Sequence, residues 1–105
     1  MKYFWINLES AVTRRTNLLK QFADNNITEH YRVNAYPSID DTKRAKESAC
    51  CRSHLQAMTH FLLNTTDEYA LICEDDLTFE LKKYWKQSVE DVVKNAPADW
   101  GIIQL

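Results

Sequence analysis

The chain has 105 residues, of which 45% are hydrophobic and 11% aromatic, and 13 basic against 15 acidic side chains give a formal net charge of −2. This length allows one domain or part of one, and the apolar content is sufficient for a core, which excludes a disordered chain. The slightly acidic balance and the lack of a basic stripe argue against nucleic-acid binding. The first apolar stretch is too short for a signal peptide or a membrane span, so no transmembrane segment is expected.

The first half of the chain alternates between strand and helix patterns. Residues 3–8, YFWINL, are apolar and aromatic, which is typical of a buried strand. Apolar residues at helical spacing over 12–24 predict an amphipathic helix. A second strand is expected over 30–36, where Pro37 ends it. Together these elements predict a β–α–β unit with parallel strands.

The second half continues the alternation, with a helix predicted over about 47–64. The apolar stripe of this helix comprises Cys51, Leu55, Met58, Phe61 and Leu62. Residues 69–73 predict a third strand, residues 81–96 a third helix and residues 100–105 a fourth strand. The pattern indicates an α/β fold with a mostly parallel sheet and flanking helices. Because no covering helix follows the last strand, residues 1–105 are expected to be the truncated N-terminal part of a longer single domain, completed by a further segment or a partner.

Three carboxylates, Glu74, Asp75 and Asp76, directly follow the third expected strand. In open α/β sheets, ligands bind beyond the carboxyl ends of the strands. Side chains alternate along an extended segment, so Glu74 and Asp76 are expected to face one site while Asp75 points away. Such a pair suits Mg²⁺ or Mn²⁺, which bridge protein carboxylates to substrate phosphates. The alternative is a solvated turn in which Asp75 or Asp76 caps the next helix.

The numbers and positions of glycine and cysteine limit which phosphate-binding loops, disulfides and metal sites the chain can form. The single glycine excludes both a GxGxxG loop and a Walker phosphate loop. Cys50, Cys51 and Cys73 are an odd number without a secretory signal, so we expect reduced thiols and a cytoplasmic location. Cys50 and His54 stand four residues apart on one helix face, a spacing that can hold zinc together with Cys73 and His60. Buried structural cysteine is the better interpretation, because no CxxC or HxxxH motif accompanies them.

Four parts of the sequence form a pattern that resembles a known family. They are FWINLESAVTRR, YRVNAY, ESACCRSHLQAM, and YALICEDDLTF with ADWGIIQL after it. In this order they resemble glycosyltransferase family 25, which includes bacterial lipooligosaccharide galactosyltransferases and collagen galactosyltransferases. The chain departs from the family pattern at Glu9-Ser10, where a basic residue is missing, and at Lys46 and Ala49, which replace glycines.

The resemblance implies a GT-A-type, Rossmann-like sheet that binds a nucleotide sugar. Glu74 and Asp76 would hold Mn²⁺ or Mg²⁺ against the donor diphosphate, and Asp75 would support ribose or sugar contacts. Asn7 and Arg14 match family residues at the end of the first strand and after it, and would contact the donor. The implied reaction is inverting transfer of a hexose, galactose or glucose, from a UDP-sugar to a glycan or glycoprotein acceptor.

Two other functions stay open at this point. A truncated, catalytically inactive relative would act as a binding or structural module, which the missing second half and the lost glycines favour. A receiver-like domain with an acidic Mg²⁺ pocket ranks last, because that fold places an acidic pair after the first strand, where this chain has Glu9 alone. No general base can be assigned: Asp40, Asp41 and Asp99 qualify by residue type only and are better explained as turn residues.

Overall fold

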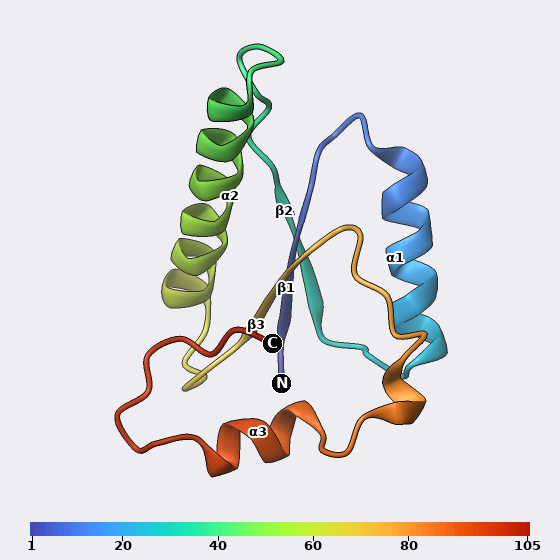
Figure 1. The fold of residues 1–105 in the computed structure, drawn as a ribbon, viewed down its shortest axis with the longest axis vertical. Coiled ribbons are helices and arrows are strands. Elements are labelled where there is room, and N and C mark those ends of the chain that lie inside the picture. The colour runs from blue at the N-terminus through green and yellow to red at the C-terminus, as the bar shows by residue number, and fades with distance from the viewer.

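The computed structural model describes residues 1–105 and shows a three-stranded sheet with helices around it (Figure 1). The elements are β1 (Tyr3–Asn7), α1 (Val12–Asp24), β2 (His30–Asn34), α2 (Lys43–Asn64), β3 (Leu71–Glu74), the 3₁₀ helix η1 (Lys82–Tyr84) and α3 (Val89–Asn95). The strand order is β2-β1-β3, and both pairings are parallel. The predicted α/β class with a parallel sheet is therefore confirmed. None of the helices combines the length and the apolar content needed to cross a membrane.

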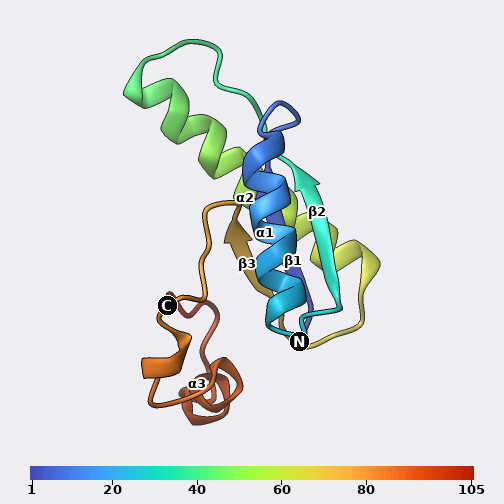
Figure 2. The same cartoon turned by 90° about the vertical axis from the view of Figure 1, so that its right-hand side faces the viewer.

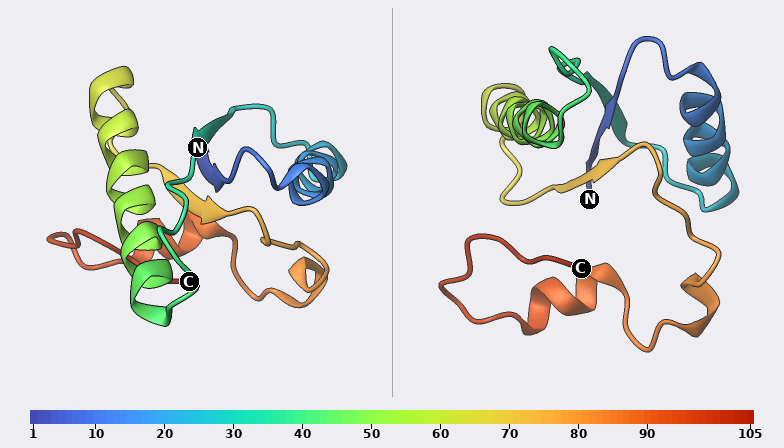
Figure 3. Two further views of the ribbon diagram at one scale, coloured as in Figure 1. Left: turned by 90° about the horizontal axis from the view of Figure 1, so that it is seen from above. Right: turned by 45° about the horizontal axis from the view of Figure 1, so that its top comes forward.

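Helices α1 and α2 cover opposite faces of the sheet, as Figures 1 and 3 show. All five residues of β1 are buried, and successive side chains point to opposite faces. The core on the α1 face comprises Tyr3, Trp5, Leu18, Phe22, Cys73 and Phe79. The core on the α2 face comprises Phe4, Ile6, Val33 and Ala57. The central strand therefore contributes to both cores, and each of its faces anchors one helix.

The connections leave a switch point at the carboxyl ends of β1 and β3. From β1 the chain runs through α1 to β2 on one side, and then through α2 back across the sheet to β3 on the other side. The strand order therefore reverses at β1, with β2 on one side of it and β3 on the other. In open α/β sheets, this is the place where ligands bind.

The predicted bounds of the first helix are confirmed, whereas several other helices and strands begin or end at residues that differ from the predicted ones. β1 and β2 each end before the predicted strand ends, and β3 lies over Leu71–Glu74 instead of 69–73. α2 begins at Lys43, earlier than the predicted start near residue 47. Thr42 explains the earlier start, because its hydroxyl accepts a hydrogen bond from the backbone N–H of Ala45, at 3.2 Å, and caps the helix.

α2 presents a different face to the sheet from the one that its apolar stripe predicts. Its buried residues are Ala49, Ser53 and Ala57. From the predicted stripe, Phe61 packs against the core, but Cys51, Leu55 and Leu62 are exposed. Small side chains let a helix lie close to the strands, and they give only a weak signal in a pattern of large apolar residues.

Substitutions on the two faces of α2 test this orientation. We expect Ala57→Leu to lower the free energy of unfolding by about 1–3 kcal/mol, because Ala57 is 0% exposed and the larger side chain must push α2 away from the sheet. Leu55→Ala, on the exposed face, should change it by less than about 1 kcal/mol. Urea unfolding followed by circular dichroism measures both. A larger loss for Leu55→Ala would show that the sequence-based stripe is the packed face.

The prediction of one long helix over 81–96 is wrong. The segment forms η1 and, separately, the short helix α3, which Figures 1 and 2 show near the amino ends of the strands. Ser88 sets the start of α3. Its hydroxyl accepts a hydrogen bond from the backbone N–H of Asp91, and the Asp91 carboxylate accepts one from the backbone N–H of Ser88. This capping box starts a new helix and interrupts the predicted one.

The prediction of a fourth strand over 100–105 is also wrong. Trp100 donates its backbone N–H to the carbonyl of Pro97, at 3.1 Å, which closes a turn instead of a strand pairing. Its ring packs against Tyr69, with ring centroids 6.3 Å apart. Ile102 remains largely exposed, so the apolar character of the segment does not produce a buried strand.

Candidate functional site

The acidic segment lies at the switch point, at the carboxyl end of β3. Ile6 of β1 is the register partner of Glu74, and the residues that follow, Asn7 and Asp75, are joined by a side-chain hydrogen bond. Successive side chains along β3 point to opposite faces, so Glu74 faces α2 whereas Asp75 faces the α1 side. The predicted divergence of these two neighbours is therefore confirmed.

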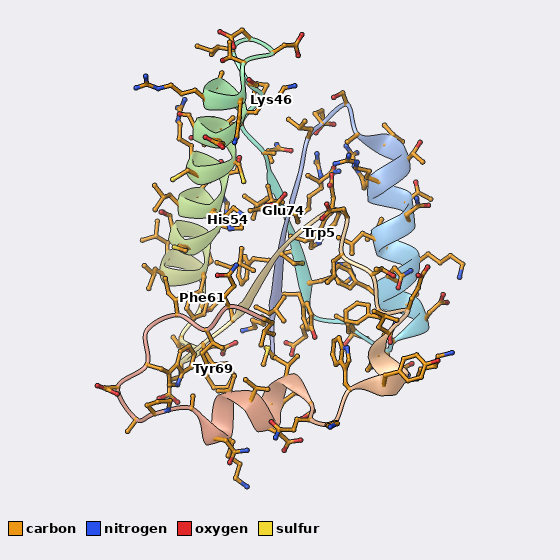
Figure 4. All side chains as sticks on the ribbon, in the orientation of Figure 1. Trp5, Lys46, His54, Phe61, Tyr69 and Glu74 are labelled. Carbon is orange, nitrogen blue, oxygen red and sulfur yellow. The ribbon has the colours of Figure 1, made fainter.

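Glu74 contacts two residues of α2, as Figure 4 shows for His54. Its Oε1 atom lies 3.1 Å from His54 Nε2 and accepts a hydrogen bond from the Cys50 thiol at 3.4 Å. The hydrogen bond with His54 holds the pKa of Glu74 below its usual value. Loss of solvation, followed by the hydrogen bond to Glu74, raises the pKa of Cys50. The three side chains bring sulfur, nitrogen and oxygen ligand atoms within 4.8 Å of one another.

Asp75 connects β3 to β1 and α1. Its Oδ2 accepts a hydrogen bond from Asn7 Nδ2 at 2.6 Å, and its Oδ1 lies 3.4 Å from a guanidinium nitrogen of Arg14. The Asp75 side chain is 9% exposed, whereas that of Arg14 is 65% exposed and remains open to a ligand. The structure thus brings together the three residues to which the family resemblance assigns donor contacts. Their binding of a donor stays a prediction.

Asn7 is buried and uses every hydrogen bond that its amide can make. Nδ2 donates to the carbonyl of Ala11 and to Asp75, and Oδ1 accepts from the Nε atoms of Arg15 and Arg32 at 3.0 Å each. The amide has no hydrogen bond left for a ligand. We therefore expect Asn7 to act by positioning Asp75 and the turn after β1.

Asp76 is exposed and makes no hydrogen bond or ion pair with the protein. Its carboxylate is therefore free, as a cation site requires, but the structure shows no contact that joins it to Glu74. The helix-cap alternative is wrong, because a turn follows β3 and Ser88 caps α3. The free carboxylate of Asp76 and the accessible one of Glu74 are hard oxygen ligands of the kind that Mg²⁺ and Mn²⁺ prefer.

The first turn of α1 borders the same edge of the sheet. No side chain caps this turn, and it contains no acidic residue. The first backbone N–H groups of a helix lack intrahelical partners and carry the positive end of its dipole. Together with the exposed Arg14, they favour an anion at this position. Carboxylates and anion-binding groups thus lie on either side of the switch point.

Sequence reasoning missed the polar network around Asn7. Arg32 donates to a Glu9 carboxylate oxygen at 2.9 Å, and Arg15 donates to the Glu9 carbonyl at 2.7 Å. Hydrogen bonding to Arg32 holds the pKa of Glu9 below its usual value. The alternation of side chains along β1 could have indicated this network, because it places Asn7 on the same face as Tyr3 and Trp5, the face that α1 covers.

Two cavities lie at the other end of the sheet, near the amino ends of the strands. Their volumes are about 330 and 390 Å³, and both include Met1 and Glu29 in their linings. Neither includes a residue of the acidic segment. These two cavities therefore do not take part in the chemistry at the switch point.

The candidates for a general base lie in irregular segments, as expected. Asp40 precedes α2, accepts hydrogen bonds from Thr42, and through them has a pKa below its usual value. Asp41 pairs with Lys46 at 3.6 Å, and Asp99 lies in the turn after α3.

Comparisons with family models, with curated proteins and with solved structures found no match to this chain. The resemblance to glycosyltransferase family 25 therefore rests on the sequence segments alone. What the structure establishes is a parallel α/β sheet with a polar, acidic edge at its switch point.

Alkylation rates should separate the three cysteines. Cys50 and Cys51 are exposed, whereas Cys73 lies in the α1-side core, where burial raises its pKa to about 12. Because the thiolate is the reacting form, we expect Cys73 to react with iodoacetamide at least about 100-fold more slowly than the other two. Mass spectrometry of peptides measures the rates, and the difference should vanish in urea. Equal rates without denaturant would contradict the packing of β3.

Proposed function

We propose that this chain is the donor-binding half of a metal-dependent glycosyltransferase with a GT-A-type fold. It transfers a hexose, galactose or glucose, from a UDP-sugar to a glycan or glycoprotein acceptor. The observation that carries the proposal is the acidic triplet at the switch point of a parallel sheet, beside an uncapped helix and an exposed arginine. The order of the four family-like segments supports the choice of sugar nucleotide over other phosphate ligands.

The residues at this edge divide into anion-binding and cation-binding groups. Arg14 and the first N–H groups of α1 bind the diphosphate of the donor. Glu74 and Asp76 hold Mn²⁺ or Mg²⁺, and the ion neutralises the charge that develops on the leaving diphosphate. Asp75 accepts hydrogen bonds from ribose or sugar hydroxyls with the Arg14-facing side of its carboxylate, while Asn7 fixes its orientation.

A second candidate is a catalytically inactive relative that binds the donor as a binding or structural module. One feature of the chain favours it: the binding roles proposed for Glu74, Asp75 and Asp76 leave no carboxylate of this triplet to act as a general base. Inverting transfer needs a further carboxylate to deprotonate the acceptor hydroxyl. Asp40 is held by Thr42, and Asp99 lies beyond α3. The two candidates share the donor site and differ in turnover.

The test is calorimetric titration of UDP into the purified chain, with Mn²⁺ and then with EDTA. We expect binding that requires the metal, and at least about tenfold weaker binding for Asp76→Asn, which removes a charged ligand. Asp99→Asn is the matched control, because it removes the same charge from an exposed turn. The absence of UDP binding by the folded wild-type chain, or equal losses in both variants, would overturn the proposal. Release of UDP from UDP-sugars by the chain would exclude the inactive module.

We also propose a cytoplasmic location. The structure contains three free cysteines and no disulfide, and two of the thiols are exposed. Free exposed thiols are typical of a reducing compartment. UDP-sugar would then be taken from the same compartment.

A further inference from the structure

A second cluster of ligand atoms lies on the α2 side of the same edge. Cys50 and His54 are four residues apart on α2, so their side chains lie one above the other on one face of the helix. Glu74 comes from the end of β3 and meets both of them. Figure 4 shows His54 and Glu74 between α2 and the sheet. One helix and one strand thus fix three different ligand types around a common point.

We propose that Cys50, His54 and Glu74 form a binding site for a divalent transition-metal ion of the zinc type. The site shares Glu74 with the proposed sugar-nucleotide cation site and differs from it in its other two ligands, a thiolate and an imidazole. Zn²⁺ binds sulfur, nitrogen and carboxylate oxygen, whereas Mg²⁺ and Mn²⁺ favour oxygen ligands. The inference does not depend on UDP binding.

Two of the three ligand–ligand distances are close to those of tetrahedral coordination. Metal–ligand bonds of about 2.0–2.3 Å in a tetrahedron place ligand atoms about 3.3–3.7 Å apart. Oε1 of Glu74 lies 3.1 Å from His54 Nε2 and 3.4 Å from Cys50 Sγ, and all three atoms lie within 4.8 Å of one another.

The surroundings leave one coordination position open. The His54 and Glu74 side chains are 33% and 49% exposed, and Cys50 is also exposed. Three protein ligands with access to solvent leave the fourth position to water or a ligand, as in catalytic zinc sites. Arg14 is the nearby cationic side chain that acts on the Glu74 carboxylate. Binding displaces the thiol proton of Cys50, which passes to the buffer.

The remaining cysteines and histidines are not part of the cluster. Cys73 lies in the core on the α1 face of the sheet, on the side opposite to α2. His60 is exposed further along α2 and is not among the three residues whose ligand atoms converge. Cys51 is exposed on a neighbouring face of α2 and also lies outside the cluster. The ligand set thus differs from the Cys50, His54, Cys73 and His60 set that sequence spacing suggests.

The test titrates Zn²⁺ into the reduced, metal-free chain against a chromophoric zinc indicator. We expect one ion per chain, and at least about 100-fold weaker binding for Cys50→Ser, because the thiolate is the strongest ligand of the set. Cys51→Ser is the matched control, since it removes the adjacent exposed thiol, and it should bind as the wild type does. His54→Gln should likewise weaken zinc binding, and its matched control, His60→Gln, should bind zinc as the wild type does. Circular dichroism establishes that each variant is folded.

Cobalt provides an independent measurement of the ligands. Co²⁺ bound through Cys50 should give a thiolate-to-metal charge-transfer band, which Cys50→Ser removes and Cys51→Ser keeps. The proposal is overturned if the wild type binds no zinc, or if the Cys51→Ser and His60→Gln controls lose as much affinity as their partners. Both sites use Glu74, but the two proposals are tested separately. Cys50→Ser should remove zinc binding and keep Mn²⁺-dependent UDP binding, whereas Asp76→Asn should weaken UDP binding and keep one zinc ion per chain.

Discussion

Replacing Phe22 by alanine should lower the free energy of unfolding by about 3–5 kcal/mol. The side chain is 0% exposed, and its ring contacts those of Tyr3, Trp5 and His30, with centroids 5.6, 6.2 and 4.7 Å away. Alanine would leave a cavity between α1 and the sheet that surrounding aromatic rings cannot fill without breaking their own contacts. Since domains of this size are stable by about 5–15 kcal/mol, the loss removes a large part of the total.

Leu19 is the matched control for Phe22, because it lies on the same helix but is 39% exposed. In the wild type, the Leu19 side chain buries less apolar surface than that of Phe22, and alanine is a strong helix former. Leu19→Ala should therefore lower the free energy of unfolding by at most about 1 kcal/mol. Urea unfolding followed by circular dichroism measures both variants. Equal losses would show that α1 does not dock through its Phe22 face.

The elements that pack on the central strand could be predicted from the sequence, and the peripheral ones could not. The first helix has the predicted bounds because its pattern and its packing surface agree. Within the predicted stripe over 81–96, Leu81 and Tyr84 remain exposed and do not join the core. In that segment, the local capping box at Ser88 determines where the helix begins.

The candidate site could be located from the sequence, but its contacts could not be derived. Three carboxylates after a strand indicate the carboxyl edge of the sheet, where the structure places them. The contact of Glu74 with Cys50 and His54 depends on which face α2 turns toward the sheet. The large apolar residues of α2 suggest a different face from the one that packs. The one feature of the site that the sequence was sufficient to predict is that Glu74 and Asp75 face opposite sides of the sheet, because side chains alternate in direction along β3.

Replacing Asn7 by leucine should lower the free energy of unfolding by at least about 3 kcal/mol. The amide is 1% exposed, and leucine would remove the hydrogen bonds that it makes with Asp75, Arg15 and Arg32. Each buried polar group left without a partner costs about 1–3 kcal/mol, and more where it is charged. Asn34 is the control, because it is the register partner of Asn7 on β2 and is exposed. Asn34→Leu should change the free energy by less than about 0.5 kcal/mol.

The Asn7→Asp variant should show a loss of stability that depends on pH. The oxygen that accepts from Arg15 and Arg32 is retained, but the N–H group that donates to Asp75, at 2.6 Å, becomes a second oxygen. Two carboxylates at this distance must share a proton or move apart, so the folded pair binds a proton more tightly than the unfolded chain does. Stability is then lost as the pH rises, and the variant should lie closer to the wild type near pH 4 than near pH 7. Urea unfolding of both proteins at the two pH values gives the difference. A difference that does not vary with pH would contradict this expectation and show that Arg15 and Arg32 neutralise the added carboxylate.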